Sequence, residues 1–434
     1  MAIDTKLLRK SVLALFAGQV SKLAIQAVYF VALARMLGPT DYGAFAAVLA
    51  LAALVSPFSS LGTNTLMVRN VAQDPVTARY EWKRALVFTA FGGMISSLLL
   101  ASASHWVAPA DVSWAGIFYV AVADLVGLRL VDLVGSFRQA VGSSRALAIL
   151  PSLANTCRLV AAVTANLALG TLSLETWSWI YAAATLPLGA GVAVLTTVRI
   201  GFYRGKTKVT PREMREGLLF ATALASQNVY NDIDKAMLGR LVSATSAGIY
   251  SAAYRIIDMA YAPIRSVSAA AYPLYFKEGK SGLRSALKLT RKISFLVLGY
   301  AVVGAIGVAF AAPLAPAILG TDYSEAVQYI QPMAWLIILR AGSFLAADTL
   351  TGCGHQSYRT AVQASMAAIN VCMNFYLLPQ YGIAGAVIST LLCEALLGSL
   401  LWLYIVVQLQ RAPEVAPRAS ARRKRGRHRA SSRV

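Results

Sequence analysis

Twelve long apolar runs take up most of this 434-residue chain, and they constrain its fold more than any other feature. A helix needs about 20 mostly apolar residues to cross the hydrocarbon core of a bilayer. Charged residues, Gly or Pro bound each run, and Gly and Pro do not extend a helix without cost. The sequence therefore predicts an all-α integral membrane protein with about 12 transmembrane helices. The predicted spans are 12–37, 44–68, 85–103, 113–135, 147–169, 176–198, 217–238, 248–276, 293–319, 324–351, 358–378 and 383–407.

The composition supports the same class. Apolar residues make up 57% of the chain and charged residues only 14%, against roughly a quarter in an ordinary soluble domain. This balance excludes a secreted disulfide scaffold, a disordered chain and an ordinary cytosolic enzyme. The four cysteines and three histidines show no metal-ligand spacing, and the acids of the outside loops form no catalytic constellation. We therefore expect no metal site, no catalytic residue and no enzymatic activity.

The positions of the cations predict the orientation of the chain. If the N-terminus is cytoplasmic, 31 of the 40 Lys and Arg residues fall on the cytoplasmic side, two on the opposite side and seven within spans. Cytoplasmic segments of membrane proteins carry an excess of Lys and Arg. We therefore expect both termini in the cytoplasm. This topology accounts for the net charge of +21, so no nucleic-acid partner is expected.

The chain reads as two halves with a tail. The predicted units are an N-terminal six-helix lobe (1–200), a basic cytoplasmic linker (201–216), a C-terminal six-helix lobe (217–407) and a disordered basic cytoplasmic tail (408–434). Gly43 and Gly248 each begin a Gly-X-aromatic sequence at the start of a long helix, 205 residues apart. This offset favours a parallel repeat about an axis along the membrane normal. In transporters, such repeats enclose a binding site near the membrane midplane.

Polar residues recur within several apolar runs at steps of three, four and seven, which place them on one face of each helix. Ionisable residues inside a membrane are costly, so they normally face a cavity or a partner. The sequence therefore predicts that these stripes line a wet central cavity between the lobes. The stripes are Gln19, Lys22, Gln26 and Tyr29; Asn228, Asn231, Asp232 and Lys235; Arg255, Asp258, Tyr261 and Arg265; and Gln363, Asn370 and Asn374.

Two cations within spans are the strongest candidates for binding an anion. Lys22 and Arg158 have no acidic residue within one helical turn, whereas Arg129 and Arg255 each have an Asp three residues later. An Asp at that spacing can pair with the cation on the same helix. An unpaired cation in a cavity suits an anionic substrate, and Arg in particular suits phosphate. The alternative is that both cations hold the two lobes together.

Three blocks of sequence resemble a known family. Residues 34–43, ARMLGPTDYG, look like the first-loop signature of the Wzx-type polysaccharide flippases. Residues 231–253, which begin NDIDK and include AGIY, are similar to the signature of their seventh and eighth helices. Asn370, Asn374 and the residues that follow as far as Glu394 match the pattern of their last two helices. The blocks are spread over the whole chain, and their spacing fits the family.

The resemblance implies membership of the multidrug/oligosaccharidyl-lipid/polysaccharide exporter superfamily. Its members have two six-helix lobes around a V-shaped cavity and work by ion-coupled alternating access. Wzx-type members move undecaprenyl-diphosphate-linked oligosaccharides from the cytoplasmic to the periplasmic leaflet of the bacterial inner membrane. The implied function is therefore a flippase for surface polysaccharide or exopolysaccharide biosynthesis. The implied partners are the lipid-linked substrate, the membrane, and the polysaccharide polymerase and export machinery.

The resemblance also suggests roles for the polar residues. The candidates for binding the diphosphate and the sugars are Lys22, Arg158, Gln19, Gln26, Asn228, Asn231, Lys235, Arg255, Asn370 and Asn374. The candidates for coupling to a proton or a sodium ion are four acids within spans, Asp124, Asp234, Asp258 and Glu394. No cofactor is expected besides this coupling ion. Two alternatives are a cation-coupled drug antiporter of the same superfamily and an integral membrane glycosyltransferase or ligase.

Overall fold

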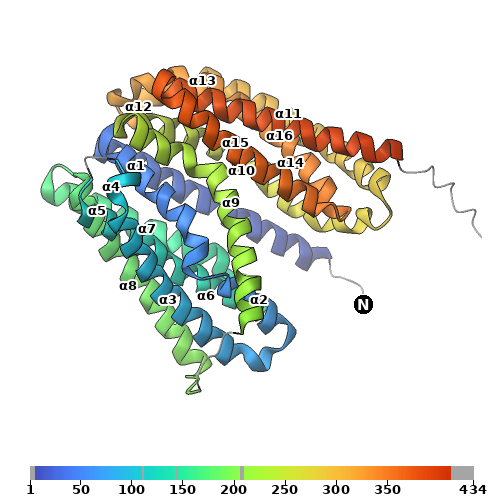
Figure 1. The fold of residues 1–434 in the computed structure, drawn as a ribbon, viewed down its shortest axis with the longest axis horizontal. Helices are drawn as coiled ribbons and strands as arrows, with labels where there is room; N and C mark the ends of the chain where they lie inside the picture. The colour runs from blue at the N-terminus through green and yellow to red at the C-terminus, as the bar shows by residue number, and fades with distance from the viewer. Residues whose placement is uncertain (1–4, 110–111, 143–144, 206–209, 412–434) are drawn as a thin grey trace, which may run out of the picture.

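The chain folds entirely into helices over the residues that the computed structural model describes (Figure 1). These residues are 5–109, 112–142, 145–205 and 210–411, with side chains from residue 23 onward except those of 145, 147, 148, 212 and 223. The predicted all-α class is therefore confirmed. The predicted tail lies outside the described residues from 412 onward, and its first residues, 408–411, belong instead to the last helix.

The helices of the two halves follow one another with short connections. The first half contains α1 (Thr5–Ser59), α2 (Thr63–Gln73), η1 (Pro75–Thr77), α3 (Ala78–Ser102), α4 (Ser104–Val107), α5 (Trp114–Val122), η2 (Ala123–Leu128), α6 (Arg129–Ala140), α7 (Arg145–Leu169) and α8 (Leu174–Ile200). The second half contains α9 (Pro211–Leu241), α10 (Ala244–Gly279), α11 (Leu283–Ala311), η3 (Ala312–Leu314), α12 (Ala315–Leu319), η4 (Thr321–Ala326), α13 (Val327–Met333), α14 (Trp335–Gly352), α15 (Gln356–Tyr381) and α16 (Ile383–Arg411).

Every predicted span falls on one helix or on consecutive helices. By length and apolarity alone, six helical stretches of the described chain could cross a membrane, or seven if the bent pair α13–α14 counts as one. The stretch within α1 covers two predicted spans. The helices α9 and α10 are absent from this set because charged and amide side chains interrupt their apolar sequence. Several of those side chains line the cavity that is described below.

Several element boundaries differ from the prediction. The first two predicted spans form one bent helix, α1, which kinks at Gly38 (φ 69°) just before Pro39. The second span ends at Ser59 rather than at 68, because Leu61 and Gly62 adopt positive φ values before α2 begins. The predicted linker is also shorter, since α9 begins at Pro211, where Thr210 and Glu213 form a capping box.

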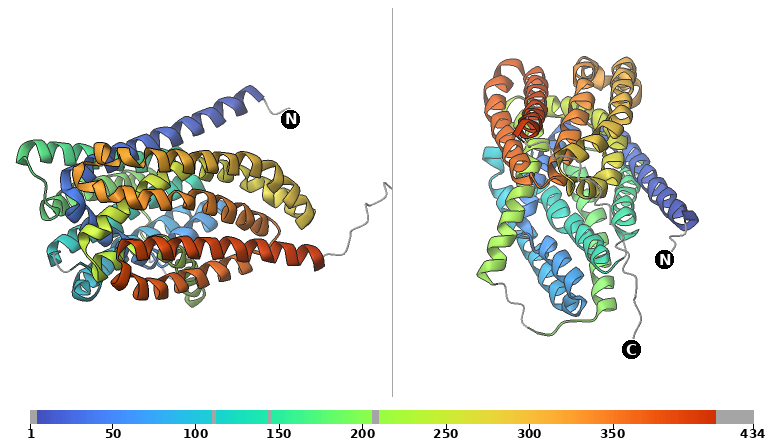
Figure 2. Two further views of the ribbon diagram at one scale, coloured as in Figure 1. Left: turned by 90° about the horizontal axis from the view of Figure 1, so that it is seen from above. Right: turned by 90° about the vertical axis from the view of Figure 1, so that its right-hand side faces the viewer.

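The helices gather into two bundles with α1, α9 and α10 between them. Figures 1 and 2 show α3 and α5–α8 in one bundle and α11 and α13–α16 in the other. The helix α1 packs along both α9 and α10, so the first half contacts the second along this line. The N-terminal part of α1 extends beyond the bundles, as the left view of Figure 2 shows.

Equivalent residues of the two halves touch each other where α1 meets α10. The hydroxyl oxygens of Thr40 and Thr245, 205 residues apart, are 2.8 Å from each other. A Cβ atom on Gly248 would lie 1.9 Å from the carbonyl oxygen of Pro39, and one on Gly43 would lie 2.4 Å from the backbone nitrogen of Gly248. Only glycine permits this approach, which brings together the two positions that the sequence repeat pairs.

A second contact between the halves lies at the start of α9. The buried guanidinium of Arg84 on α3 binds Glu81 (2.6 Å) and Glu213 (2.5 Å). Arg69 on α2 binds Glu216 at 2.9 Å. Burial acts to raise the pKa of Glu213, but hydrogen bonds from the Thr210 backbone and the Arg84 side chain outweigh it and hold the pKa at about 2. This cluster fastens the first turn of α9 to the N-terminal half.

Candidate functional site

A cavity of about 720 Å³ lies between the two halves. It is lined by α1, η2, α6, α7 and α8 of the first half and by α9, α10, α14, α15 and α16 of the second. It is densely charged for a space inside a membrane protein. Its lining includes six cations, Arg158, Lys235, Arg255, Arg265, Arg340 and Arg359. The lining also includes five carboxylates, Asp124, Asp132, Asp232, Asp258 and Glu394. A membrane protein keeps such groups only where they face a cavity or one another.

Arg158 on α7 is the most buried cation of the cavity. Its side chain is only 5% exposed, its Nε donates to the Thr185 hydroxyl at 3.0 Å, and its guanidinium carbon lies 4.3 Å from the centroid of the Tyr181 ring. One terminal nitrogen, Nη2, is buried and has no hydrogen-bond partner among the described residues. A guanidinium that has one nitrogen hydrogen-bonded and another without a partner can donate to an anion that enters the cavity.

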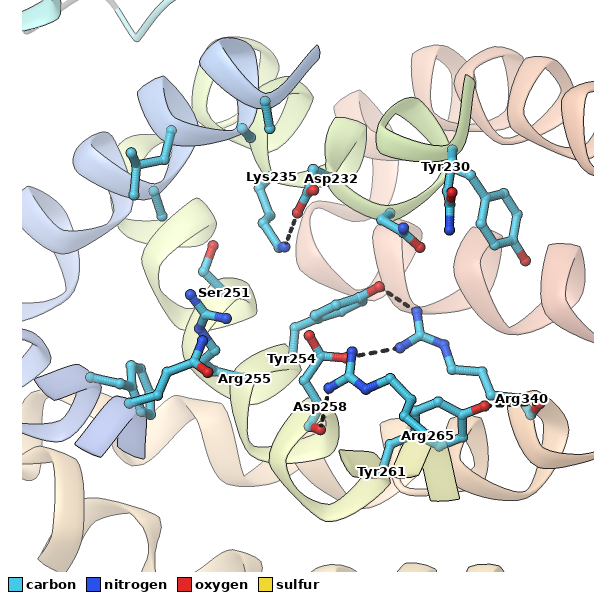
Figure 3. Close-up of a pocket in the computed structure, with 18 of the residues that line it drawn as sticks. Tyr230, Asp232, Lys235, Ser251, Tyr254, Arg255, Asp258, Tyr261, Arg265 and Arg340 are labelled. Carbon is cyan, nitrogen blue, oxygen red and sulfur yellow. Dashed lines mark hydrogen bonds and ion pairs between the residues drawn. The ribbon is translucent and has the colours of Figure 1, made fainter. Parts of the chain in front are cut away.

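Arg340, on the opposite side of the cavity, is already paired. Arg340 on α14 donates from Nη1 to Asp258 at 3.2 Å and from Nη2 to the Tyr254 hydroxyl, and its Nε lies 3.8 Å from Glu394 (Figure 3). The Tyr230 hydroxyl donates to the same Glu394 carboxylate at 2.7 Å. Helices α9, α10, α14 and α16 thus meet in one network of charges and hydroxyls.

A second pair stands beside this network. Lys235 and Asp232, both on α9, are 2.5 Å apart, and the Lys235 ammonium lies 4.4 Å from the centroid of the Tyr254 ring. Figure 3 shows both side chains reaching toward the same space as Tyr254. The polar stripe predicted on this helix therefore does face the cavity at Asn231, Asp232 and Lys235.

The pairing expected within α10 is wrong. Asp258 binds Arg340 of another helix instead of Arg255, because the Arg255 side chain turns away from the Arg340 network (Figure 3). Within the described part of the chain, Arg255 forms no ion pair. The other expected pair, Arg129 with Asp132, is present at 3.1 Å. Arg255 thus joins Arg158 as a cavity cation without a carboxylate partner.

The structure separates the predicted substrate-binding residues into three groups. Five of them line the cavity: Gln26, Arg158, Asn231, Lys235 and Arg255. Asn228 does not, because its amide donates to the Ala53 carbonyl on α1 at 2.7 Å. Asn370 and Asn374 are buried inside the second bundle and do not reach the cavity. The side chains of Gln19 and Lys22 lie outside the described part of the chain.

Asn374 contacts Asp234, one of the predicted coupling acids, in a buried polar cluster. Asp234 is 2% exposed and accepts hydrogen bonds from Tyr250 (2.8 Å), Thr390 (2.6 Å) and Asn374 (2.6 Å). Asn374 in turn donates to Asn370 at 3.2 Å. The donors come from α10, α15 and α16, so this carboxylate on α9 links four helices of the second half. Asn370 and Asn374, which we predicted to bind sugars, therefore lie in the hydrogen-bonded cluster around this buried carboxylate instead.

The other three predicted coupling acids line the cavity itself. Asp258 and Glu394 flank Arg340, as described above. Asp124 is 7% exposed and lies in the π-helical segment η2, between α5 and α6. Such segments inside α-helices often occur at functional sites. The described residues contain no group of three or more His, Cys, Asp or Glu side chains that could hold a metal ion.

Aromatic side chains are the part of the lining that sequence reasoning undervalued. Tyr29, Tyr42, Tyr181, Tyr230 and Tyr254 all reach the cavity. The spacing of residues could have indicated this: Tyr254, Asp258, Tyr261 and Arg265 follow steps of four, three and four, a better helical stripe than one that begins at Arg255.

A second cavity of about 400 Å³ shares several lining residues with the first and extends between α1 and α10, from Leu23 to Ala269.

Comparisons with known proteins agree with this geometry. The sequence model of a family described as polysaccharide biosynthesis protein matches residues 8–278. No curated protein matches the sequence. An inward-facing multidrug resistance MATE family transporter of the MOP superfamily has a similar fold, with a TM-score of 0.71 at 14% identity over 91% of this chain and 98% of that one. Its outward-facing form gives a TM-score of 0.62 at 13% identity over 91% and 94%.

A third similar structure is a MOP superfamily transporter from Pyrococcus furiosus, described as having a binding pocket of reversed polarity. Its TM-score is 0.62 at 12% identity, over 91% of this chain and 94% of that one. At these identities the structures show the shared fold, whereas the match of the family model covers more than half of the sequence. The matched residues contain two of the three blocks singled out in the sequence, 34–43 and 231–253, and the predicted family is thus confirmed. The chain belongs to the polysaccharide biosynthesis protein family and is a multi-pass membrane protein with the two-lobed fold of MOP-superfamily transporters.

Proposed function

We propose that the protein is a flippase that moves undecaprenyl-diphosphate-linked oligosaccharide repeat units from the cytoplasmic to the periplasmic leaflet of the bacterial inner membrane. The observation that carries this proposal is Arg158, a buried guanidinium that lines the cavity and whose Nη2 has no hydrogen-bond partner among the described residues. A diphosphate diester offers that donor several acceptor oxygens. A cavity with eleven charged side chains between two apolar lobes suits a substrate with a polar head and a lipid tail.

Alternating access is the mechanism that this fold supports. The contact at Thr40, Gly43, Thr245 and Gly248 closes one end of the cavity, and the cation distribution assigns that end to the periplasm. The TM-score to the inward-facing transporter is also higher than that to its outward-facing form. We therefore assign the described conformation to the state that loads substrate from the cytoplasmic side, with both termini in the cytoplasm.

We place the coupling ion at Asp234. Its carboxylate is surrounded by hydroxyl and amide groups from three neighbouring helices, the chemistry that a sodium ion or a proton needs in a buried site. The other three acids line the cavity, and Asp258 and Glu394 are engaged by Arg340 there. Asp234→Asn should therefore leave the protein folded but make transport insensitive to the ion gradient. A variant that still responds to an imposed proton or sodium gradient would move the coupling site elsewhere.

A deletion strain tests the function itself. Loss of the flippase should stall lipid-linked repeat units in the cytoplasmic leaflet and remove the corresponding surface or secreted polysaccharide. A drug antiporter, the candidate that the similar MATE structures favour, would instead leave the glycans normal and raise sensitivity to cationic drugs. Normal surface glycans, with no stalled intermediates, would refute the flippase.

A further inference from the structure

We propose that the two sides of the cavity recognise different chemical parts of the substrate. Arg158 on α7 holds the diphosphate, together with Arg255, which lies on the side of α10 that is remote from Arg340. The cavity surface around Arg340, which we call the glycan wall, binds hydroxyl groups of the first sugars. This inference rests on the proposed function and assigns the substrate's two parts to two sets of residues. The glycan wall consists of Asp232, Lys235, Tyr254, Asp258, Arg340 and Glu394, which all line the cavity.

The pairing of its charges makes the glycan wall a poor diphosphate site. Arg340 donates to Asp258 and Tyr254, and Lys235 donates to Asp232. An incoming diphosphate would have to displace these acceptors. The released carboxylates would then face the diphosphate as like charges in a medium of low dielectric. Cations that are already neutralised in this way therefore contribute little to anion binding.

The same pairing suits neutral hydroxyl groups. Each carboxylate has about four acceptor positions, and the pairs leave some of them unused. The side chains of Asp232 and Asp258 are 29% and 22% exposed, so their free oxygen positions can be reached from the cavity. A sugar hydroxyl both donates and accepts, so it can bridge a carboxylate and the neighbouring cation or tyrosine.

Arg158 and Arg255 have the opposite character. Neither forms an ion pair within the described part of the chain, and Arg158 retains a buried donor that nothing satisfies. Figure 3 shows Arg255 on the side of α10 that is remote from Arg340. Arg158 and Arg255 therefore lie apart from the paired Arg340 within a single cavity, as a substrate with a charged and a neutral part requires. Arg265 has no ion pair either within the described residues, but it lies beside the Arg340 network and donates to the Asp258 carbonyl at 3.0 Å.

The test uses two probes with the purified full-length protein in detergent. One is a short-chain prenyl diphosphate, and the other is the same prenyl diphosphate esterified to a disaccharide. The ratio of their dissociation constants measures what the sugars add to binding. Two variants alter the glycan wall, Asp258→Asn and Tyr254→Phe, and Arg158→Gln alters the diphosphate side. Thermal melting of each variant checks that it is folded.

The wild type should bind the disaccharide probe more tightly than the bare diphosphate. Asp258→Asn and Tyr254→Phe should reduce that ratio by about tenfold, since a lost hydrogen bond to a charged group has an effect of this order. Both should bind the bare diphosphate as well as the wild type or better, because they lose an acceptor that competes for Arg340. Arg158→Gln should weaken both probes by the same factor and leave the ratio unchanged.

Three results would overturn the assignment. If the wild type binds both probes equally, the cavity does not bind the sugars. If both glycan-wall variants keep the wild-type ratio, residues outside the glycan wall bind the sugars. An Arg158→Gln variant that changes the ratio would contradict the separation of roles. If Asp258→Asn unfolds, Tyr254→Phe decides alone, since it removes one hydroxyl. Failure of both probes to bind the wild type would instead count against the proposed function.

Discussion

The charged residues of this protein differ in what surrounds them, and that difference decides their roles. Arg158 and Arg340 are both cavity-lining arginines on membrane helices. Arg340 is held by carboxylates and a tyrosine, whereas Arg158 is held by one threonine and one aromatic ring. Of these two arginines, Arg158 is therefore the one that can take an anionic partner from the substrate. Burial alone would not have separated the two residues.

Arg158→Lys should impair export almost as strongly as Arg158→Gln. The planar guanidinium forms a fork of donors that the lysine ammonium cannot reproduce. A hydrogen bond to a charged group contributes about 1.5–3 kcal/mol, so we expect export to fall by about tenfold or more. The measurement is surface polysaccharide in a complemented deletion strain. Arg129→Gln is the matched control, because its partly exposed pair with Asp132 lies at the edge of the site and should matter little.

The same strain separates a binding role from a structural one. If Arg158 mainly holds helices together, Arg158→Gln should lower protein abundance or melting temperature. Normal abundance together with normal export would exclude both roles.

Sequence reasoning found the polar residues of the helices but could not orient all of them. It predicted Arg158, Lys235 and Asn231 as cavity residues, and the structure places them there. It placed Asn370 and Asn374 in the cavity as well, but they face the interior of their own bundle and contact Asp234 there. Helical spacing shows that residues share a face, yet it does not show whether that face meets a cavity or another helix.

At the scale of elements, α9 connects the two halves of the molecule. Its first turn is fastened to α2 and α3 by Glu213 and Glu216, while its middle carries Asp232 and Lys235 into the cavity. No sequence pattern predicted this connection, because Arg84 and Glu213 lie 129 residues apart and look like ordinary cytoplasmic charges. Helix positions within the membrane were predictable from apolar runs, whereas contacts between distant charges were not.

Acidification should weaken this connection at the start of α9. The pKa of Glu213, about 2 in the folded protein, lies below its usual value of 4.5, because hydrogen bonds from Thr210 and Arg84 outweigh the effect of burial. The ionised form is thus favoured by folding, and its contribution is complete above pH 4.5 and is lost as pH falls toward 2. The melting temperature of the wild type should fall across that window more steeply than that of Glu213→Gln.

Glu216→Gln is the comparison variant for this experiment. It removes a more exposed pair with Arg69, and exposed pairs contribute little to stability. Its melting temperature should follow the wild type at every pH. Parallel curves for Glu213→Gln and the wild type would show that Glu213 does not link α9 to α3 in solution.

At the scale of the whole molecule, the two halves meet on a pseudo-symmetric contact. The sequence repeat paired Gly43 with Gly248 at an offset of 205 residues, and the structure brings these positions into contact. The relation of the halves was therefore predictable. The shape and charge pattern of the cavity were not, because they depend on side chains from many helices of both halves whose mutual rotation no single-sequence pattern specifies.

Closing this contact covalently should stop the transport cycle. Thr40→Cys combined with Thr245→Cys replaces two hydroxyls whose oxygen atoms are 2.8 Å apart, close enough for the sulfur atoms to form a disulfide of normal length. Oxidation should trap the cavity in its present state and stop export, and a reductant should restore export. Each single variant should export normally under both conditions. Undiminished export by the cross-linked double variant would show that this end of the cavity does not open.

The most direct measurement of the central claim is transport by the purified protein in liposomes. Vesicles would contain a prenyl-diphosphate-linked oligosaccharide with a fluorescent group on its sugars, and a membrane-impermeant quencher would report the fraction in the outer leaflet. With the wild type, nearly all of the lipid should become accessible to the quencher, and with Arg158→Gln about half of it should stay protected, as in protein-free vesicles. Equal protection in wild-type and protein-free vesicles, across every imposed proton and sodium gradient, would contradict the account.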